Sequence, residues 1–176
     1  LVFAKFSQVR ARVLYSQNIL IHLMEGEPVL TFRAANERSF QILDARVKLT
    51  MGRQEMTSDG EEMRRIYDLE LKRETSPMFA LLWNVYHEIN TDSPLYGYTP
   101  EQLENDQVSL MISLNGVDDA LGQQTHSRHA YRAMDILFNQ RFVDIIGTNA
   151  EGKRVVNYHN FHKHIETGKK LDWDKS

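Results

Sequence analysis

Strict alternation of apolar and polar residues is the feature of this sequence that most constrains its fold. From Leu43 to Met51 every second residue is apolar, and charged or hydroxyl residues occupy the positions between them. Residues 108–115 repeat the period, with aliphatic side chains at every even position. Successive side chains of a strand point to opposite faces of a sheet, so both segments predict strands with one buried face.

Shorter strands and turns account for most of the remaining chain. Turn signals such as Glu-Gly-Glu-Pro at 25–28 and Thr-Ser-Asp-Gly at 57–60 separate the strand segments. Residues 78–85 are a nearly continuous apolar run, which periodicity alone does not distinguish from a short helix, and we expect a strand there. The other predicted strands are 9–13, 19–23, 29–33, 67–71, 142–146 and 155–161.

A single helix is predicted near the middle of the chain. Thr99 supplies a hydroxyl cap, Pro100 suits the first helical position, and Gln102 lies three residues after the cap. Many short strands at turn-punctuated intervals, with one short helix, predict an all-β sandwich.

Composition places the chain among ordinary globular domains. Its 176 residues are 41% apolar and 26% charged, which suits one domain with a core of its own. The net charge of −3 does not favour a nucleic-acid partner. The absence of cysteine excludes disulfides and agrees with a reducing, cytoplasmic compartment. No apolar run approaches the roughly 20 residues of a membrane span, and the opening at Leu1 rather than Met fits a fragment or a processed product.

The segment that follows residues 108–115 is unusual for a hairpin connection. Residues 116–124 contain two glycines with small or apolar residues, and no Asn-Gly or Asp-Gly pair to close a tight turn. Such a loop is more apolar than an ordinary solvent-exposed loop, so we expect its tip to pack against another surface. Asp119 and Arg128 supply one acid and one base on its two sides.

The histidines near the end of the chain do not predict a metal site. On a strand His162 and His164 share a face without His159, whereas on a helix only His159 and His162 do, so neither conformation gathers all three. We therefore expect no metal and no cofactor.

An enzyme is also not expected. Ser93, His87 and Asp92 are near one another in sequence, but no Gly-x-Ser-x-Gly elbow, phosphate-binding glycine loop or His-Glu-x-x-His motif is present. An immunoglobulin-like module used only for protein interaction is the alternative from a different functional class.

Several short motifs along the chain together resemble a known family. They are Phe-Arg-Ala-Ala-Asn at 32–36, Asp-Ala at 44–45, His-Glu-Ile at 87–89, Asp-Ser-Pro-Leu-Tyr at 92–96, Thr-His-Ser-Arg-His-Ala-Tyr at 125–131, Asp-Ile-Leu at 135–137, Arg141, Tyr158 and Phe-His-Lys at 161–163. In this order, across residues 3–166, they resemble the cytoplasmic domain of inward-rectifier potassium channels, most closely the prokaryotic branch. The resemblance implies an immunoglobulin-like β-sandwich that forms a homotetramer around a cytoplasmic pore for potassium and other cations.

The resemblance also implies a domain division and a location. Residues 1–8 would be a linker from a missing inner transmembrane helix, 9–166 the sandwich, and 167–176 a polar C-terminal tail. The domain would lie on the cytoplasmic side of the bacterial inner membrane, where it would couple cytoplasmic signals to the transmembrane pore.

Two residues fall at positions that the family places along the ion pathway. Asp44 matches an acidic residue facing the fourfold pore, although on spacing alone it reads as a solvated charge beside Arg46 and Lys48. Asn115 falls where many eukaryotic relatives have a second acid. Its neutral side chain argues against strong block by magnesium or polyamines.

The remaining family positions concern a constriction and the membrane. Gly116, Val117 and Gly122 fall on the loop that forms the constriction, and Asp119 and Arg128 match an acid and a base that bridge this loop to its supporting strand. The membrane-proximal basic residues are Lys5, Arg10 and Arg12. Between them, Phe-Ser-Gln-Val at 6–9 replaces the basic cluster with which eukaryotic members bind a phosphoinositide, so contact with membrane lipid is expected without activation by that lipid.

Overall fold

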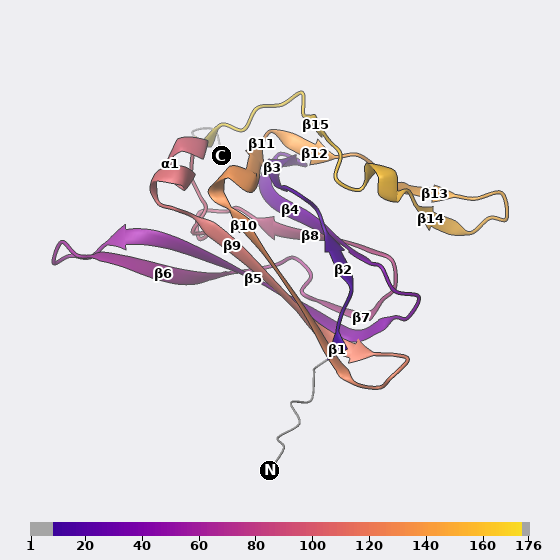
Figure 1. Cartoon of the computed structure of the whole chain (residues 1–176). Helices are drawn as coiled ribbons and strands as arrows, with labels where there is room; N and C mark the ends of the chain where they lie inside the picture. Colours follow the sequence, from indigo (N-terminus) through magenta and orange to yellow (C-terminus); the bar gives the residue numbers. More distant parts are fainter. Residues whose placement is uncertain (1–8, 174–176) are drawn as a thin grey trace, which may run out of the picture.

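Two β-sheets packed face to face form the core of the protein (Figure 1). The structure, a computed structural model, describes residues 9–173. The first sheet has the order β1-β10-β9-β5-β6, with β7 paired to β5, and the second has the order β11-β3-β4-β2, with β8 paired to β4. The predicted all-β sandwich is confirmed.

The first sheet contains the two longest alternating segments of the sequence. On β5 the side chains of Ala45, Val47 and Leu49 are buried. Those of Ile112 and Leu114 on the neighbouring strand β9 lie beside them on the same face of the sheet. The bounds of the strands in this sheet are β1 (Val9–Arg10), β5 (Ile42–Met56), β6 (Glu62–Leu69), β7 (Thr75–Phe79), β9 (Ser109–Asp118) and β10 (Gln124–Arg132).

The second sheet is buried on both faces along its central strand. Nine of the ten residues of β4 are buried, because the inner face packs on the first sheet and the outer face is covered by the C-terminal segment. The bounds of the strands in this sheet are β2 (Val13–Tyr15), β3 (Ile19–Met24), β4 (Glu27–Asn36), β8 (Leu82–Glu88) and β11 (Ile136–Phe138). The apolar run 78–85 proves to be the end of β7, a turn and the start of β8 rather than one strand.

The predicted helix is confirmed as α1 (Pro100–Asn105). The Thr99 hydroxyl accepts the amide of Gln102, whose side chain in turn accepts the amide of Thr99. This reciprocal capping offsets two of the unpaired amides at the start of a helix. The only apolar anchor of the helix is Leu103, which is fully buried.

The C-terminal segment forms two small two-stranded sheets on the outside of the second sheet. In one, β12 (Gln140–Phe142) pairs with β15 (His164–Glu166), and in the other, β13 (Ile146–Thr148) pairs with β14 (Arg154–Val156) and projects away from the sandwich (Figure 1). The strands predicted at 142–146 and 155–161 are therefore replaced by shorter ones, of which β13 and β14 pair as a hairpin. Two 3₁₀ turns complete the chain, η1 (Ala133–Asp135) and η2 (Tyr158–Asn160).

A buried arginine fastens this C-terminal segment to β4. The Arg33 guanidinium donates to the carbonyl oxygens of Phe161 and Val143 at 2.7 Å each, and to those of Asn160 and Lys163 at 3.2 and 3.4 Å. The Phe142 ring lies 4.4 Å from its central carbon. Burial lowers the pKa of Arg33 to about 10, which leaves the group charged at neutral pH.

The segment after β15 is packed, contrary to the predicted polar tail at 167–176. The Leu171 amide donates to Asn139 at 2.7 Å, and the Trp173 indole donates to the Tyr98 carbonyl at 3.0 Å while its ring contacts Tyr96. The domain boundary at residue 166 stays a prediction, although Leu171 and Trp173 beyond it contact the sandwich. The linker predicted at 1–8 lies outside the described residues.

Candidate functional site

A β-bulge lies at Asp44, near the start of β5. Leu43 pairs with Val117 and Arg46 with Asn115, so two residues of β5 stand opposite one residue of β9. Asp44 has a φ of 48°, a left-handed conformation that Asp adopts more readily than most residues. Its side chain is exposed. Asp44 is thus exposed in alternation with the buried residues Ala45 and Val47, as are Arg46 and Lys48, and the bulge interrupts the regular alternation only between Ile42 and Ala45.

Gly116 occupies the position opposite the bulge. A Cβ atom there would come within 2.4 Å of Ile42 Cγ2 and 2.8 Å of the Leu43 carbonyl oxygen. Real Cβ atoms do not approach that closely, so only glycine lets β9 lie against the bulge. Gly116 is a buried strand residue rather than part of a loop.

The connection between β9 and β10 is a hairpin turn and not the nine-residue loop that was predicted. Pairing continues through Val117 and Gln124, which leaves residues 119–123 as the connection. Gly122 has a φ of 61°, and its amide donates to the Asp118 carbonyl at 2.8 Å. Of the three positions assigned to a constriction, Gly116 and Val117 therefore belong to β9 and Gly122 to the turn.

Asp118 supplies the turn chemistry that the sequence analysis overlooked. Its carboxylate is 5% exposed and accepts the amides of Ala120 and Leu121 at 2.8 and 3.0 Å. An Asp that binds the amides two and three residues later is a local turn signal, and it was readable in the sequence.

Asp119 and Arg128 do not form the expected brace within this chain. Both side chains are exposed, and neither takes part in an ion pair among residues 9–173. Arg128 stands opposite Ser113, four residues into β10, which separates it from the turn by about 13 Å of strand. The Asp119 amide instead donates to the Gln41 carbonyl at 3.1 Å.

The solvent face of the first sheet gathers basic side chains around Asn115. Paired residues on neighbouring strands share a face, with Cβ atoms about 5 Å apart. The face carries two rows across β5, β9 and β10, which are Arg46–Asn115–His126 and Lys48–Ser113–Arg128. Lys48 is paired with Asp68 at 3.3 Å, whereas Arg46 and Arg128 make no ion pair in the described chain.

The predicted membrane-proximal basic residues follow the edge of this sheet. β1 pairs in parallel with β10, with Val9 opposite Thr125 and Arg10 opposite His126. Arg12 is exposed just beyond, and Lys5 lies outside the described residues. β1 and the β9–β10 turn are at the same end of the molecule (Figure 1).

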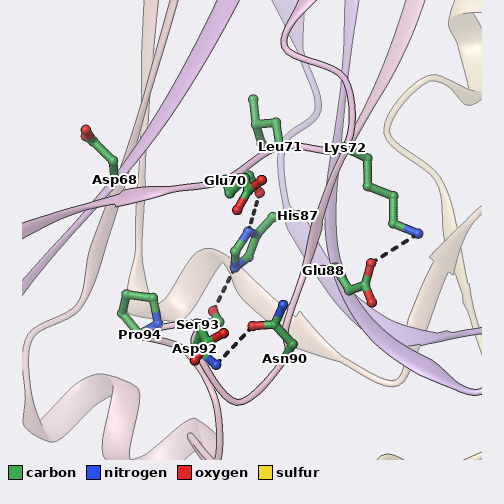
Figure 2. A pocket seen from close by; sticks show the side chains of 10 residues that line it. All are labelled: Asp68, Glu70, Leu71, Lys72, His87, Glu88, Asn90, Asp92, Ser93 and Pro94. Carbon is green, nitrogen blue, oxygen red and sulfur yellow. Dashed lines mark hydrogen bonds and ion pairs between the residues drawn. The ribbon is translucent and has the colours of Figure 1, made fainter.

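A polar pocket of about 280 Å³ lies at the opposite edge of the first sheet, where β6 ends (Figure 2). At its base His87 is 4% exposed; its Nδ1 donates to the Glu70 carbonyl at 2.6 Å, and its Nε2 accepts the Ser93 hydroxyl at 2.7 Å. Burial lowers the pKa of His87, so the neutral imidazole is favoured.

The hydrogen-bond partners of His87 indicate a structural role and not a catalytic triad. A backbone carbonyl occupies the place of a triad acid, and the Ser93 hydroxyl also accepts the Leu95 amide at 3.2 Å. Asp92 is exposed and binds Asn90 through its own amide. The imidazole therefore joins β6 to the turn before α1.

The C-terminal histidines are dispersed. His162 accepts the Gln17 amide at 2.9 Å, and His164 lies 2.9 Å from the Gln140 side chain. In residues 9–173 no three His, Asp or Glu side chains converge in a way that could hold a metal ion. Nor does any helix in this range have the length and apolar character needed to cross a membrane.

Comparison with known proteins identifies relatives among the inward rectifier potassium channels. A family model described as inward rectifier potassium channel C-terminal domain matches residues 13–171. The chain is 39% identical over 163 residues to the inward rectifier potassium channel Kirbac3.1 of Paramagnetospirillum magnetotacticum, covering 93% of the chain and 55% of that relative. It is 30% identical over 177 residues to the inward rectifier potassium channel 4 of Homo sapiens, covering 94% of the chain and 38% of that relative. The chain thus spans about half of the first relative and less of the second.

Proposed function

The chain belongs to the inward rectifier potassium channel C-terminal domain family, and from that premise we propose that it is the cytoplasmic pore and gating domain of a bacterial potassium channel. The family match over residues 13–171 is the observation that carries the proposal. The relatives are ion channels, which confirms the expectation that the chain is not an enzyme. In the full protein the domain lies on the cytoplasmic side of the inner membrane and couples cytoplasmic signals to the transmembrane pore.

Four copies form the cytoplasmic pathway in this proposal. A closed ring of identical chains joins two different surfaces of each copy, so each domain needs an edge that accepts its neighbour. The solvent face of β5, β9 and β10 is left uncovered in the single chain, and Asp44 and Asn115 are exposed on it. With this face turned inward, four Asp44 carboxylates attract cations to the pathway.

The constriction in this proposal is built from the bulge and the turn together. Gly116 and Val117 are held in β9 by the pairing with β10, and Gly122 shapes the tip. A rigid hairpin of this kind moves as a unit with the sheet, so domain rotation changes the width of the pathway mouth.

Block by cytoplasmic spermine in the full-length channel tests the pathway assignment. Asp44→Asn removes the charge and keeps a residue that tolerates the left-handed conformation, so the affinity for spermine should fall while the domain stays folded. Unchanged block would remove Asp44 from the pathway. Sedimentation that shows only monomer, for the chain at millimolar concentration and for the full protein in detergent, would contradict the tetramer.

Lipid dependence provides a second test. The segment 6–9 contains no Lys or Arg, so it offers no cluster to pair with phosphate groups. Arg10 and Arg12 provide only isolated charges for membrane lipid. Potassium flux through channels in liposomes should be flat or reduced when a phosphoinositide is added, and activation that disappears on mutating Lys5, Arg10 or Arg12 would contradict this.

A protein-interaction module is the competing proposal, favoured by the exposed apolar residues of the β13–β14 hairpin. Ile146 and Val155 are 37% and 41% exposed in this hairpin, and Tyr158 in the following turn η2 is 45% exposed. The upstream sequence separates the two functions, because a channel requires two membrane spans flanking a Thr-x-Gly-[Tyr/Phe]-Gly filter and a module does not.

A further inference from the structure

The β5–β6 hairpin ends in an arm, residues 53–68, that projects from the sandwich without a core of its own (Figure 1). β5 pairs with β9 only as far as Gly52, and beyond that residue it pairs with β6 alone. No residue of the arm is buried. Because an isolated two-stranded hairpin is only marginally stable in water, contacts at its root must fix the position of the arm.

Arg53 makes several of the contacts at this root. Its guanidinium donates to Glu55 at 2.7 Å within the arm, and to the Pro94 carbonyl at 2.9 Å and the Tyr98 hydroxyl at 3.3 Å outside it. The Tyr67 ring on β6 lies 4.7 Å from the central carbon of the guanidinium. One side chain therefore joins both strands of the arm to the turn that precedes α1.

A second attachment holds the arm to the segment that follows α1. The Gln54 amide donates to the Asp106 carbonyl at 2.8 Å, and Arg64 donates to the Gln107 carbonyl at 3.1 Å. The Asp106 carboxylate accepts the Tyr98 hydroxyl at 2.5 Å. Burial and this hydrogen bond raise the pKa of Tyr98 to about 12, so its hydroxyl remains a donor at neutral pH. Tyr98 thus contacts both attachments of the arm.

The C-terminal segment packs on Tyr98 from the other side. Leu95, early in the turn before α1, is fully buried, whereas Tyr96 and Tyr98 are only half-buried. The Trp173 indole donates to the Tyr98 carbonyl at 3.0 Å, and its ring lies 5.3 Å from that of Tyr96. Residues 171–173 therefore form a strap across the half of the turn that is only partly packed on the core.

We propose that this strap fixes the orientation of the arm, through Tyr98 and Arg53, and that release of the strap lets the arm swing relative to the sandwich. The inference goes beyond the proposed function, because it concerns a single chain and requires neither a pore nor a membrane. The strap contributes no strand to either sheet. A change in the last few residues therefore alters the shape of the domain without unfolding it.

A distance between two spin labels tests the strap in the purified chain. The chain contains no cysteine, so Asp59→Cys at the tip of the arm and Ala130→Cys on β10, both at exposed positions, supply the two labelling sites. Dilution into unlabelled chain restricts the measurement to distances within one copy. Trp173→Ala should broaden the distribution of this distance. Trp173→Phe keeps a ring but lacks the indole donor, so it should broaden the distribution less.

Two further variants distinguish the strap from general loosening. Tyr158→Ala is the matched control, because it removes an exposed aromatic ring in η2, outside the strap, and it should leave the distribution unchanged. Arg53→Gln should broaden the distribution by itself. Trp173→Ala added to Arg53→Gln should then broaden it no further, because the strap acts through Arg53.

Three results would overturn the proposal. They are an unchanged distribution in Trp173→Ala, an equal broadening in Tyr158→Ala, and a full additional broadening when Trp173→Ala is combined with Arg53→Gln. If circular dichroism shows that Trp173→Ala does not fold, Trp173→Phe decides in its place, and a distribution identical to that of the parent refutes the strap.

Discussion

Replacing Gly116 by alanine should destabilise the protein, although the same change usually stabilises a strand. Gly116 does not need a positive φ, so alanine fits its backbone conformation. Gly→Ala at a compatible position gains about 0.4 to 1 kcal/mol by restricting the unfolded chain. The added methyl group, however, would lie 2.4 Å from Ile42 Cγ2 and 2.8 Å from the Leu43 carbonyl oxygen.

The balance of these terms gives the sign. Overpacking a filled site costs about 1 to 3 kcal/mol, and the backbone oxygen of Leu43 has no rotamer by which to move aside. Because the Leu43 oxygen cannot move aside, the cost should lie toward the upper end of this range, and subtracting the ordinary gain leaves a net loss of up to about 2.6 kcal/mol. Gly147 in β13 is the matched control, because its nearest atom, Val155 Cγ2, is 3.9 Å away and alanine meets only an ordinary contact.

Urea unfolding of the purified chain measures both variants. Gly116→Ala should lower the midpoint with an unchanged slope, and Gly147→Ala should match or exceed the parent. Combining Gly116→Ala with Ile42→Ala removes one of the two close contacts, so the two losses should be less than additive. If Gly116→Ala proves as stabilising as Gly147→Ala, β9 does not lie against the bulge as described.

Other contacts lead to three further predictions. Arg33→Met, which leaves several buried carbonyl oxygens without a donor, should cost about 3 kcal/mol or more by urea unfolding, and Arg33→Lys should recover only part of this loss. Because burial lowers the pKa of His87, the unfolded chain binds its proton more readily and stability should fall as pH drops below about 6.5. His87→Gln should flatten part of that decline in thermal melts between pH 7 and 5, and an unaltered pH profile would contradict the assignment. Asp118→Ala should lower the free energy of unfolding in urea by about 1 to 2 kcal/mol, against under about 0.5 kcal/mol for Asp119→Ala, and equal effects would show that the Asp118 carboxylate does not hold the turn.

The sequence predicted those parts of the fold that depend only on residues close to one another along the chain. The alternation of residues 43–51 identified the inner face of β5 from Ala45 onward, because burial on one face requires a period of two. The Thr99 capping box depends on three neighbouring residues, and it formed as predicted. The Asp118 turn is equally local, because its carboxylate accepts the amides of Ala120 and Leu121, two and three residues later.

Contacts between distant segments account for what the sequence did not reveal. The alternation is continuous through Asp44, so nothing in β5 alone marks the bulge, which depends on Gly116 in another strand. The packing of Trp173 on Tyr98 joins residues 75 positions apart, and that of Arg33 on Phe161 joins residues 128 positions apart. The polar composition of residues 167–176 therefore predicted a tail. Within it, the Leu171 amide binds Asn139 and the Trp173 indole binds the Tyr98 carbonyl, which holds this part of the chain on the sandwich.

The bulge gives Asp44 two separable roles, a charge and a backbone conformation, and three substitutions distinguish them. Asp44→Asn removes the charge but keeps a side chain that tolerates φ near 48°, so spermine block should weaken at unchanged stability. Asp44→Gly also lacks the charge and suits the left-handed conformation, so it should match Asp44→Asn in both measurements.

Asp44→Ala loses both properties. Its Cβ is strained at positive φ without the local hydrogen bonds available to Asp or Asn, so it should lower the free energy of unfolding by about 1 to 2 kcal/mol while weakening block as the other two variants do. Spermine block would then depend on the charge at position 44, whereas the free energy of unfolding would depend on how well the residue there tolerates the left-handed conformation. If all three variants are equally stable, the left-handed conformation does not constrain this position; if block differs between Asn and Gly, something other than the carboxylate charge holds the cation.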